Sequence, residues 1–310
     1  MKKLLLASAA VVMTAGAAAA DNANVNFGGY VRFGAQYNSA PPVGVTGKVT
    51  LEKRIRLNID ISKMSDSGIE MGARIRMQGD ENAMTAGNGA NAYVKANGFT
   101  LRVGNIVGAI ESMPGLYAAD VGLTGLNFDD LVTNVVGANL GTATPYASYW
   151  NWDAYSSTGT GSNGVEAIYT AGGFTAHLSH STLNGVSGDN QTAGFLAYTF
   201  GDWTVAVAHQ TSDTAGNKKT VLTVGGKLGD FNVGLAGADN DGVKKYTVHG
   251  SYTMSALTVN GYIATEDTSG VDTSYGVGAA YDIGGASLIG GVAKQPTGDT
   301  RADFGIKFSF

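Results

Sequence analysis

The chain contains stretches in which apolar and polar residues alternate strictly along the sequence. From Val49 to Ile61 the odd positions are apolar except for Lys53, and the even positions are polar or charged. The same alternation runs through residues 69–78 and through the C-terminal stretch 301–310. A period of two that lasts for about ten residues is typical of a strand that crosses a membrane with one face toward lipid and the other toward water. The pattern therefore predicts an all-β chain of membrane-crossing strands.

Short and long turns alternate between the predicted strands. The short turns are tight hairpin signals such as Asn97-Gly98 and Gly201-Asp202, whereas the long ones are polar. Outer-membrane barrels show this asymmetry, with short periplasmic turns and longer external loops. Large side chains beside the short turns fit an aromatic belt at the inner membrane interface: Phe99, Phe174, Phe200, Trp203, Phe231, Leu257 and Tyr281.

The number of strands depends on Tyr146 to Tyr155, which has a strand-like composition. Two periplasmic termini require an even number of strands, and the alternation of turns slips out of phase if this segment crosses the membrane. We therefore assign it to a loop and predict a transmembrane barrel of sixteen antiparallel strands, which encloses a water-filled channel. The strands are predicted at 24–38, 48–62, 68–79, 89–97, 99–105, 164–172, 173–183, 191–200, 203–212, 218–228, 231–239, 243–254, 257–266, 272–282, 286–295 and 301–310.

The segment 105–163 interrupts the alternating pattern. It contains no Lys or Arg, and it is too long for an ordinary connection unless it has a function of its own. Its acidic residues are Glu111, Asp120, Asp129, Asp130 and Asp153. We interpret this segment as an acidic loop that folds into the bore of the barrel and narrows the pore.

The N-terminal residues 1–20 have the features of a secretory signal peptide: two lysines, an apolar run, and Ala18-Ala19-Ala20 before Asp21. The alternative is a membrane anchor, but the apolar run is too short to span a bilayer. Residues 21–310 then form a single barrel domain with 18 basic and 25 acidic side chains, a net charge of −7. This balance excludes a nucleic-acid partner. The absence of Cys excludes disulfides and thiolate chemistry.

Six of the seven arginines precede residue 103, and all six share the phase of the polar face. Four of them, Arg54, Arg56, Arg74 and Arg76, lie on neighbouring predicted strands. Like charges placed so close together repel one another, so these arginines need water and opposing carboxylates. We expect them to form a basic wall at the pore constriction that faces the acidic loop and produces a transverse field. Scattered surface salt bridges are the alternative. The basic wall consists of Arg32, Arg54, Arg56, Arg74, Arg76 and Arg102, and the opposing loop carboxylates are Glu111, Asp120, Asp129 and Asp130.

Two further motifs have residue types that occur in chemical sites. The lumen-phase histidines His177 and His249, with Ser179 beside the first, suggest a hydrolase pair, but no acid-Ser-His set or nucleophile elbow accompanies them. His180 and His209 are isolated. The sequence Asp239-Asn240-Asp241-Gly242 resembles half of a calcium loop without its later Glu, so a polar turn is favoured.

Calcium is the one cofactor for which the sequence offers candidate ligands. Glu111, Asp129 and Asp130 have the oxygen ligands that Ca²⁺ prefers, and they are weak candidates for binding it. No phosphate-cradling or dinucleotide motif is present, so no other cofactor is predicted.

Six stretches, taken together in their order and spacing, resemble the Rhodobacter-type general porins of Gram-negative outer membranes over essentially the whole mature length. They are GGYVRFGAQY (28–37), RLNIDI (56–61), DSGIEMGARIRMQ (66–78), GNIVGAIES (104–112), YGVGAAYDIGG (275–285) and DFGIKFSF (303–310). The resemblance implies a homotrimer of sixteen-stranded barrels in outer-membrane lipid, each with its third external loop folded inward. It also implies that Phe310 is an assembly signal read by the barrel-insertion machinery, and it allows calcium at the loop carboxylates.

The function predicted from the sequence is passive diffusion of ions and small hydrophilic solutes, with a weak cation preference at low salt. One alternative is a plugged, non-transporting barrel, such as an adhesin or a structural protein. A barrel-resident hydrolase is the enzymatic alternative. A substrate-specific sugar channel usually carries an aromatic slide, and no such stripe lies on the polar phases.

Overall fold

The computed structural model of the chain describes residues 23–41, 47–80, 84–85, 87–117, 120–126, 152–157, 159–182, 190–214 and 217–310. The predicted signal peptide, residues 1–20, lies outside these residues. Asp129 and Asp130 of the predicted acidic loop also lie outside them.

The described residues form antiparallel strands that follow one another around a single sheet. The strands are β1 Ala23–Asn38, β2 Val49–Met64, β3 Glu70–Asp80, β4 Met84–Thr85, β5 Asn91–Ala96, β6 Phe99–Asn105, β7 Asn163–Ala171, β8 Phe174–Ser181, β9 Gln191–Phe200, β10 Trp203–Ser212, β11 Lys219–Leu228, β12 Phe231–Asn240, β13 Val243–Met254, β14 Leu257–Glu266, β15 Ser274–Asp282, β16 Ser287–Lys294 and β17 Thr300–Ser309.

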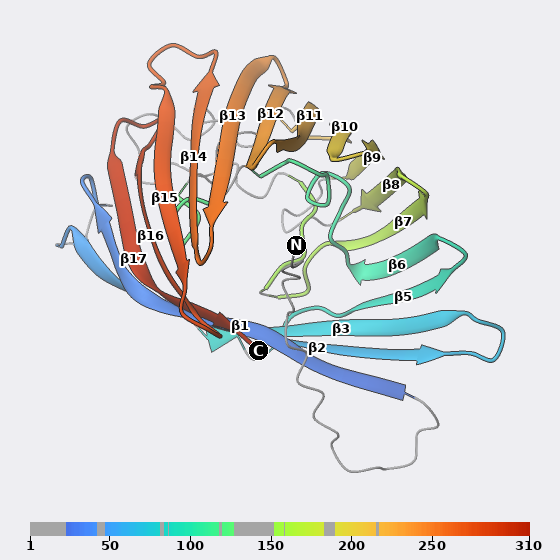
Figure 1. Cartoon of the computed structure of the whole chain (residues 1–310). Helices are drawn as coiled ribbons and strands as arrows, with labels where there is room; N and C mark the ends of the chain where they lie inside the picture. The colour runs from blue at the N-terminus through green and yellow to red at the C-terminus, as the bar shows by residue number, and fades with distance from the viewer. Residues whose placement is uncertain are drawn as a thin grey trace.

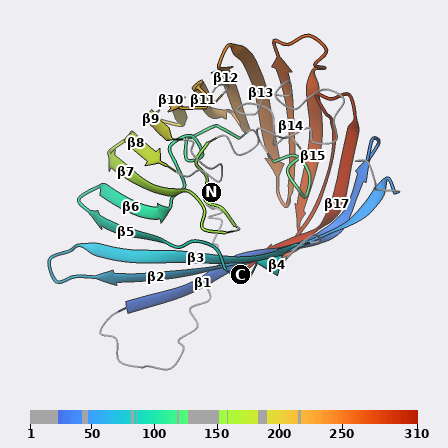
Figure 2. The ribbon, with the colours of Figure 1, turned by 180° about the vertical axis from the view of Figure 1, so that it is seen from behind.

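The last strand closes the sheet on the first. β17 pairs with β1 from Tyr30 opposite Ser309 to Asn38 opposite Arg301, while the other edge of β1 pairs with β2. The chain end extends this ladder, because the Gly29 N–H donates to the Phe310 carbonyl at 2.9 Å and the Phe310 N–H donates back at 3.1 Å. Closure gives both β1 and β17 a partner on each edge, as a membrane barrel requires. Figures 1 and 2 show the ring from opposite sides.

The sixteen-stranded barrel predicted from the sequence is confirmed, with strand ends within a few residues of those expected. The two-residue strand β4 was not predicted; it bridges to Gln78 and Gly79 beside the barrel wall. Within the segment Tyr146 to Tyr155, the described residues 152–155 are not in a strand, which agrees with their assignment to the long loop.

The alternating pattern is divided between the two faces of the wall. Apolar residues such as Leu51 and Leu178 are 79% and 65% exposed on the outside, and the polar phase of the same strands points inward. The short turns follow their sequence signals: Asn97 and Gly98 have φ of 48° and 79°, the pair of positive values that a mirror-image hairpin turn requires.

No helix among the described residues is long and apolar enough to cross a membrane.

The buried core of the molecule lies inside the ring, between the wall and the long loop. Ile110, Met113, Leu116 and Trp152 of the loop pack on the inner face of β9–β12, and Val121 packs on Tyr262, Ala264 and Ala293 farther round. Figures 1 and 2 show the described part of the loop inside the ring of strands. The prediction that the loop folds into the bore is therefore confirmed.

Candidate pore lining

The six arginines of the basic wall come from β1, β2, β3 and β6. Strand register brings them together, since Arg32 lies directly opposite Arg54, and Arg56 and Arg76 lie opposite Gln78 and Asn58. They occupy the polar, inward phase of their strands, as expected from the sequence. The exposed fraction of these side chains differs: it is 10% for Arg32 and 42% for Arg74.

Four of these arginines have carboxylate partners on the barrel wall itself. Arg32 Nε lies 2.5 Å from Glu52, Arg74 Nε lies 2.5 Å from Asp60, and Arg54 Nη2 lies 3.6 Å from Asp80. Arg102 Nη1 pairs with the buried Glu166. Sequence reasoning did not assign these partners. The signal for them was present, because Glu52 and Asp60 share the inward phase of β2 with Arg54 and Arg56.

Arg76 contacts the returning part of the loop through neutral groups. Its Nη1 donates to Ser157 Oγ at 3.1 Å, and its guanidinium carbon lies 4.5 Å from the centre of the Tyr155 ring. Burial raises the pKa of the Tyr155 phenol, which keeps the ring neutral beside the arginines. Arg56 donates to Gln78 at 2.8 Å and lies 5.2 Å from the Tyr30 ring.

The described loop carboxylates have other contacts. Glu111 Oε2 accepts hydrogen bonds from the Tyr117 hydroxyl at 2.5 Å and from Trp152 Nε1 at 2.9 Å, so it joins two parts of the loop. Asp120 is exposed, and its backbone carbonyl accepts from Asn260 on β14 at 2.6 Å. Among the described residues, neither carboxylate forms an ion pair with the basic wall.

Buried polar residues on β7 and β8 hold the two ends of the loop. The backbone N–H of Gly108 donates to Glu166 at 2.8 Å, and that of Ala109 donates to Ser179 Oγ at 2.9 Å. At the other end, Ser181 donates to Asp153 at 2.6 Å. Burial raises the pKa of the Asp153 carboxyl, and the hydrogen bonds from serine oppose that rise.

The suggested hydrolase pair is part of this attachment. His177 is 1% exposed, its Nε2 lies 3.2 Å from Glu166 Oε2, and its ring packs edge-on against Phe195. Ser179 binds the loop backbone rather than His177. Of the remaining histidines, His249 is half-buried on the inward phase, and His180 and His209 are exposed and bond to threonine hydroxyls.

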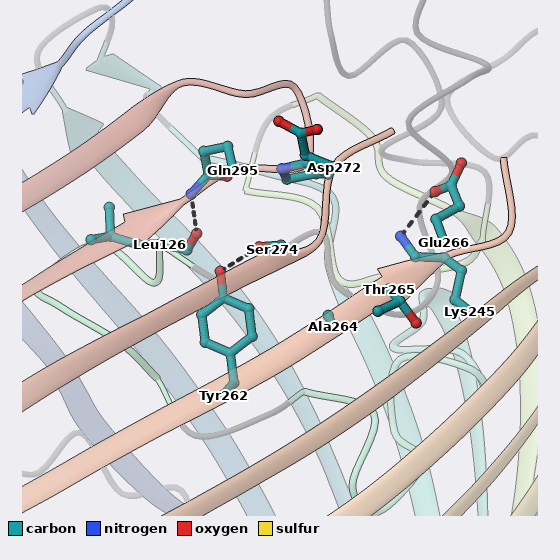
Figure 3. A pocket seen from close by; sticks show the side chains of 10 residues that line it. Leu126, Lys245, Tyr262, Ala264, Thr265, Glu266, Asp272, Ser274 and Gln295 are labelled. Atoms are coloured by element: carbon teal, nitrogen blue, oxygen red, sulfur yellow. Dashed lines mark hydrogen bonds and ion pairs between the residues drawn. The ribbon is translucent and has the colours of Figure 1, made fainter. Parts of the chain in front are cut away.

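A small pocket lies between β13–β16 and the loop. Figure 3 shows its lining, with Lys245 paired to Glu266 at 3.5 Å and the Tyr262 hydroxyl 2.7 Å from Ser274 Oγ. Gln295 Nε2 donates to the Leu126 carbonyl at 2.9 Å, so the wall holds the loop here by its backbone.

Within the described part of the chain, no group of three or more His, Asp or Glu side chains has the arrangement to hold a metal ion. Asp239, in the half-calcium-loop sequence, accepts from the Gly242 N–H at 2.7 Å and thereby caps a polar turn. Glu111 is engaged with Tyr117 and Trp152, and the other two calcium candidates lie outside the described residues.

A closed barrel with an apolar exterior, a polar interior and a loop packed within its bore defines a membrane channel of the outer-membrane type. A family model described as Gram-negative porin matches residues 7–300. The chain therefore belongs to the Gram-negative porin family, whose members form outer-membrane diffusion channels and are not enzymes.

Individual relatives agree with this membership. A porin of Fuscovulum blasticum is 30% identical over 300 residues, which cover 92% of this chain and all of that protein. A solved structure of the Rh. blastica porin, with a lysine and an arginine replaced by alanine, matches with a TM-score of 0.79 and 28% identity over 92% of this chain and 100% of that one. A second variant, with an aspartate and a glutamate replaced by alanine, has a TM-score of 0.79 and 27% identity over the same shares.

Proposed function

We propose that the channel passes ions and small hydrophilic solutes by passive diffusion, through a constriction between the basic wall and the inserted loop. The observation that carries the proposal is the approach of the returning loop to the basic wall, where Ser157 and Tyr155 contact Arg76. A water-filled lumen bordered by charged and hydrogen-bonding side chains favours polar solutes over apolar ones.

The wall carboxylates refine the expected selectivity. Glu52, Asp60, Asp80 and Glu166 offset four arginines locally, so the basic wall exerts less net attraction on anions than its six arginines suggest. The mature charge of −7 then gives a weak cation preference at low salt, which fades as ions screen the walls. We expect the simultaneous neutralisation of Glu111, Asp120, Asp129 and Asp130 to shift the preference toward anions, because it removes four negative charges from the chain.

The direct test is single-channel conductance of the purified, folded protein in a planar bilayer. Stepwise ion currents are expected, with a permeability that falls as hydrophilic solutes grow larger. A folded protein that inserts but carries no current would support the plugged, non-transporting barrel instead.

Assembly forms part of the same proposal. We infer a homotrimer in outer-membrane lipid, supported by the resemblance to general porins, and the large apolar residues exposed on the outside fit contact with that lipid. Cross-linking or native mass measurement of the detergent-extracted protein should give three copies. Monomers alone would refute it.

We also infer that Phe310 is recognised by the barrel-insertion machinery. Its aromatic side chain ends the outward phase of β17, and its backbone completes the seam with Gly29. Deletion of Phe310 should lower the outer-membrane yield far more than it alters the conductance of the molecules that do fold. A normal yield would count against this role.

A further inference from the structure

The loop segment 120–126 is held on the inner face of β14–β17 by hydrogen bonds to its backbone. The carboxylate of Asp303, on β17, accepts from the Leu123 N–H at 2.8 Å, from the Thr124 N–H at 2.8 Å and from the Thr124 hydroxyl at 2.7 Å. Asn260 and Gln295 bind the carbonyls at the two ends of the segment, at 2.6 and 2.9 Å. One buried carboxylate thus receives three donors from two consecutive loop residues.

Three glycines face inward on the part of the wall that lies beneath this segment. A Cβ added to Gly278 would lie 2.9 Å from Gly122 N, and one added to Gly291 would lie 2.7 Å from Gly122 Cα. A Cβ at Gly305 would lie 2.2 Å from the Phe33 carbonyl oxygen of β1 and 2.7 Å from Leu123 Cδ2. These positions point inward on three neighbouring strands. A side chain at Gly278 or Gly291 would collide with the loop backbone, and one at Gly305 would collide with both the wall and the loop.

The loop backbone is shaped to match. Gly122 has a φ of +80°, and a Cβ on it would lie 2.3 Å from Asp303 Oδ1. Glycine therefore lets the chain turn so that the next two N–H groups point at the carboxylate.

Arg32 belongs to the same structure. Its side chain is 10% exposed, it pairs with Glu52, and its Nη1 lies 3.5 Å from the Leu123 carbonyl. Leu123 is therefore held at both of its backbone groups, since Asp303 accepts from its N–H and Arg32 lies beside its carbonyl.

We propose that Asp303, Arg32 and the three inward glycines Gly278, Gly291 and Gly305 form a loop seat, which positions the loop and thereby sets the width of the pore. Asp303 acts as a positioning residue, and Arg32 serves the seat rather than the solute path. This inference rests on the proposed function, in which the loop is the constriction.

The test compares Asp303→Ala with the full-length wild-type channel by two readouts. Hydrogen exchange of the peptide containing Leu123 and Thr124 should accelerate about a hundredfold, because a charged acceptor of three hydrogen bonds is lost. In planar bilayers the open-channel current should become noisier and larger. The matched control is Asp282→Asn, which removes the same charge at an exposed turn where the carboxylate binds only the nearby Gly284 N–H among the described residues.

A second variant tests the geometry without loss of the fold. Gly291→Val should displace the loop while leaving Asp303 in place, and should give the same noisy current. The chain has no Cys, so Thr124→Cys with Asp303→Cys permits a reversible cross-link between loop and wall. Oxidation should restore slow exchange and a quiet current, and reduction should abolish both.

The two ideas fail in different ways. Unchanged exchange in Asp303→Ala, or equal acceleration in the Asp282→Asn control, would overturn the loop seat. Accelerated exchange with unchanged current would support the seat and refute the loop as the constriction.

Discussion

Two parts of the inner wall use the same strand geometry in opposite ways. On β2 and β3 the inward positions include Arg54, Arg74 and their carboxylate partners, which stay partly exposed. On β9–β12 many inward positions are small and apolar, and the loop covers them: Ala193, Ala197, Ala206, Ala208, Val221 and Ala238 are all buried in one cluster with Phe195. Lys219 and Gln210 are buried polar residues of the same strands. The inward phase of a channel strand can therefore serve either water or the loop.

The difference explains why the loop lies where it does. Removing charged groups from water costs several kcal/mol for each unless they are fully paired, so the described loop packs its apolar side chains on β9–β12, and the arginine that it buries, Arg32, is paired with Glu52. The alanine-lined strands bury apolar surface against the loop, and each Å² of buried apolar surface stabilises the docked loop by about 25 cal/mol. The charged pairs on β2 and β3 consequently keep contact with water, and the loop reaches this wall at Arg76 through Ser157 and Tyr155.

The largest effect is expected from removing Trp152, the loop side chain that packs on the inner face of β9–β12, which we call the covered wall. Trp152 is 1% exposed, and Trp152→Ala should weaken loop docking by about 3–5 kcal/mol, because it leaves a cavity and removes one of the hydrogen bonds to Glu111. Limited proteolysis and hydrogen exchange of residues 106–117 measure this loss. Trp203→Ala, which removes the same side chain at the predicted aromatic belt, is the control and should leave the loop protected. Equal loop exposure in both variants would show that the covered wall does not hold the loop.

A second, intermediate effect sharpens the comparison from the charged side. Asp60→Asn with Asp80→Asn should raise anion-to-cation permeability about two- to fivefold, which corresponds to roughly 0.5–1 kcal/mol of added attraction in a water-filled pore. Glu111→Gln should change it less, because Glu111 is engaged within the loop on the covered side. Reversal potentials in a salt gradient at low ionic strength compare the two. A shift for Glu111→Gln as large as for the wall pair would put the acidic loop, and not the wall, in control of selectivity.

Much of this architecture follows from the sequence because a period of two fixes which face a residue occupies. The strands and the inward phase of the arginines follow from that period, and the number of strands in the closed barrel follows from the alternation of short and long turns. The partners of the arginines depend on register: Asp60 meets Arg74 only because β2 and β3 pair at those positions. Phase does not specify register, so the sequence alone points to the acidic loop as the source of countercharge.

The course of the loop was also readable in part. Inward alanines at 193, 206 and 238, and inward glycines at 278, 291 and 305, leave room that a loop fills. An aqueous lumen does not require such small residues. The contacts of Asp303 remained hidden, since a single inward carboxylate on the last strand looks the same whether it faces water or backbone N–H groups.

The smallest predicted effect concerns Asp153, at the end of the loop beside the covered wall. Burial and the nearby Glu166 carboxylate raise its pKa, while Ser181, Ser162 and His180 favour its charged form. For a carboxyl whose folded-state pKa is raised, the stabilising contribution is complete below the unfolded pKa of about 3.9 and is lost as pH rises through the folded value.

Asp153→Asn removes this loss, since an amide stays neutral and its oxygen still accepts from Ser181. The loop of the variant should therefore be held slightly more tightly than that of the wild type at pH 7, with no difference near pH 3. Ser181→Ala is the opposing variant: it removes a donor to the carboxylate and should weaken docking at pH 7 when Asp153 is present, but much less in the Asp153→Asn background. Hydrogen exchange of residues 152–157 across this pH range measures both. If Asp153→Asn instead loosens the loop at pH 7, the carboxylate contributes more as an ion than burial costs it, and this end of the loop would be held by charge, like the basic wall.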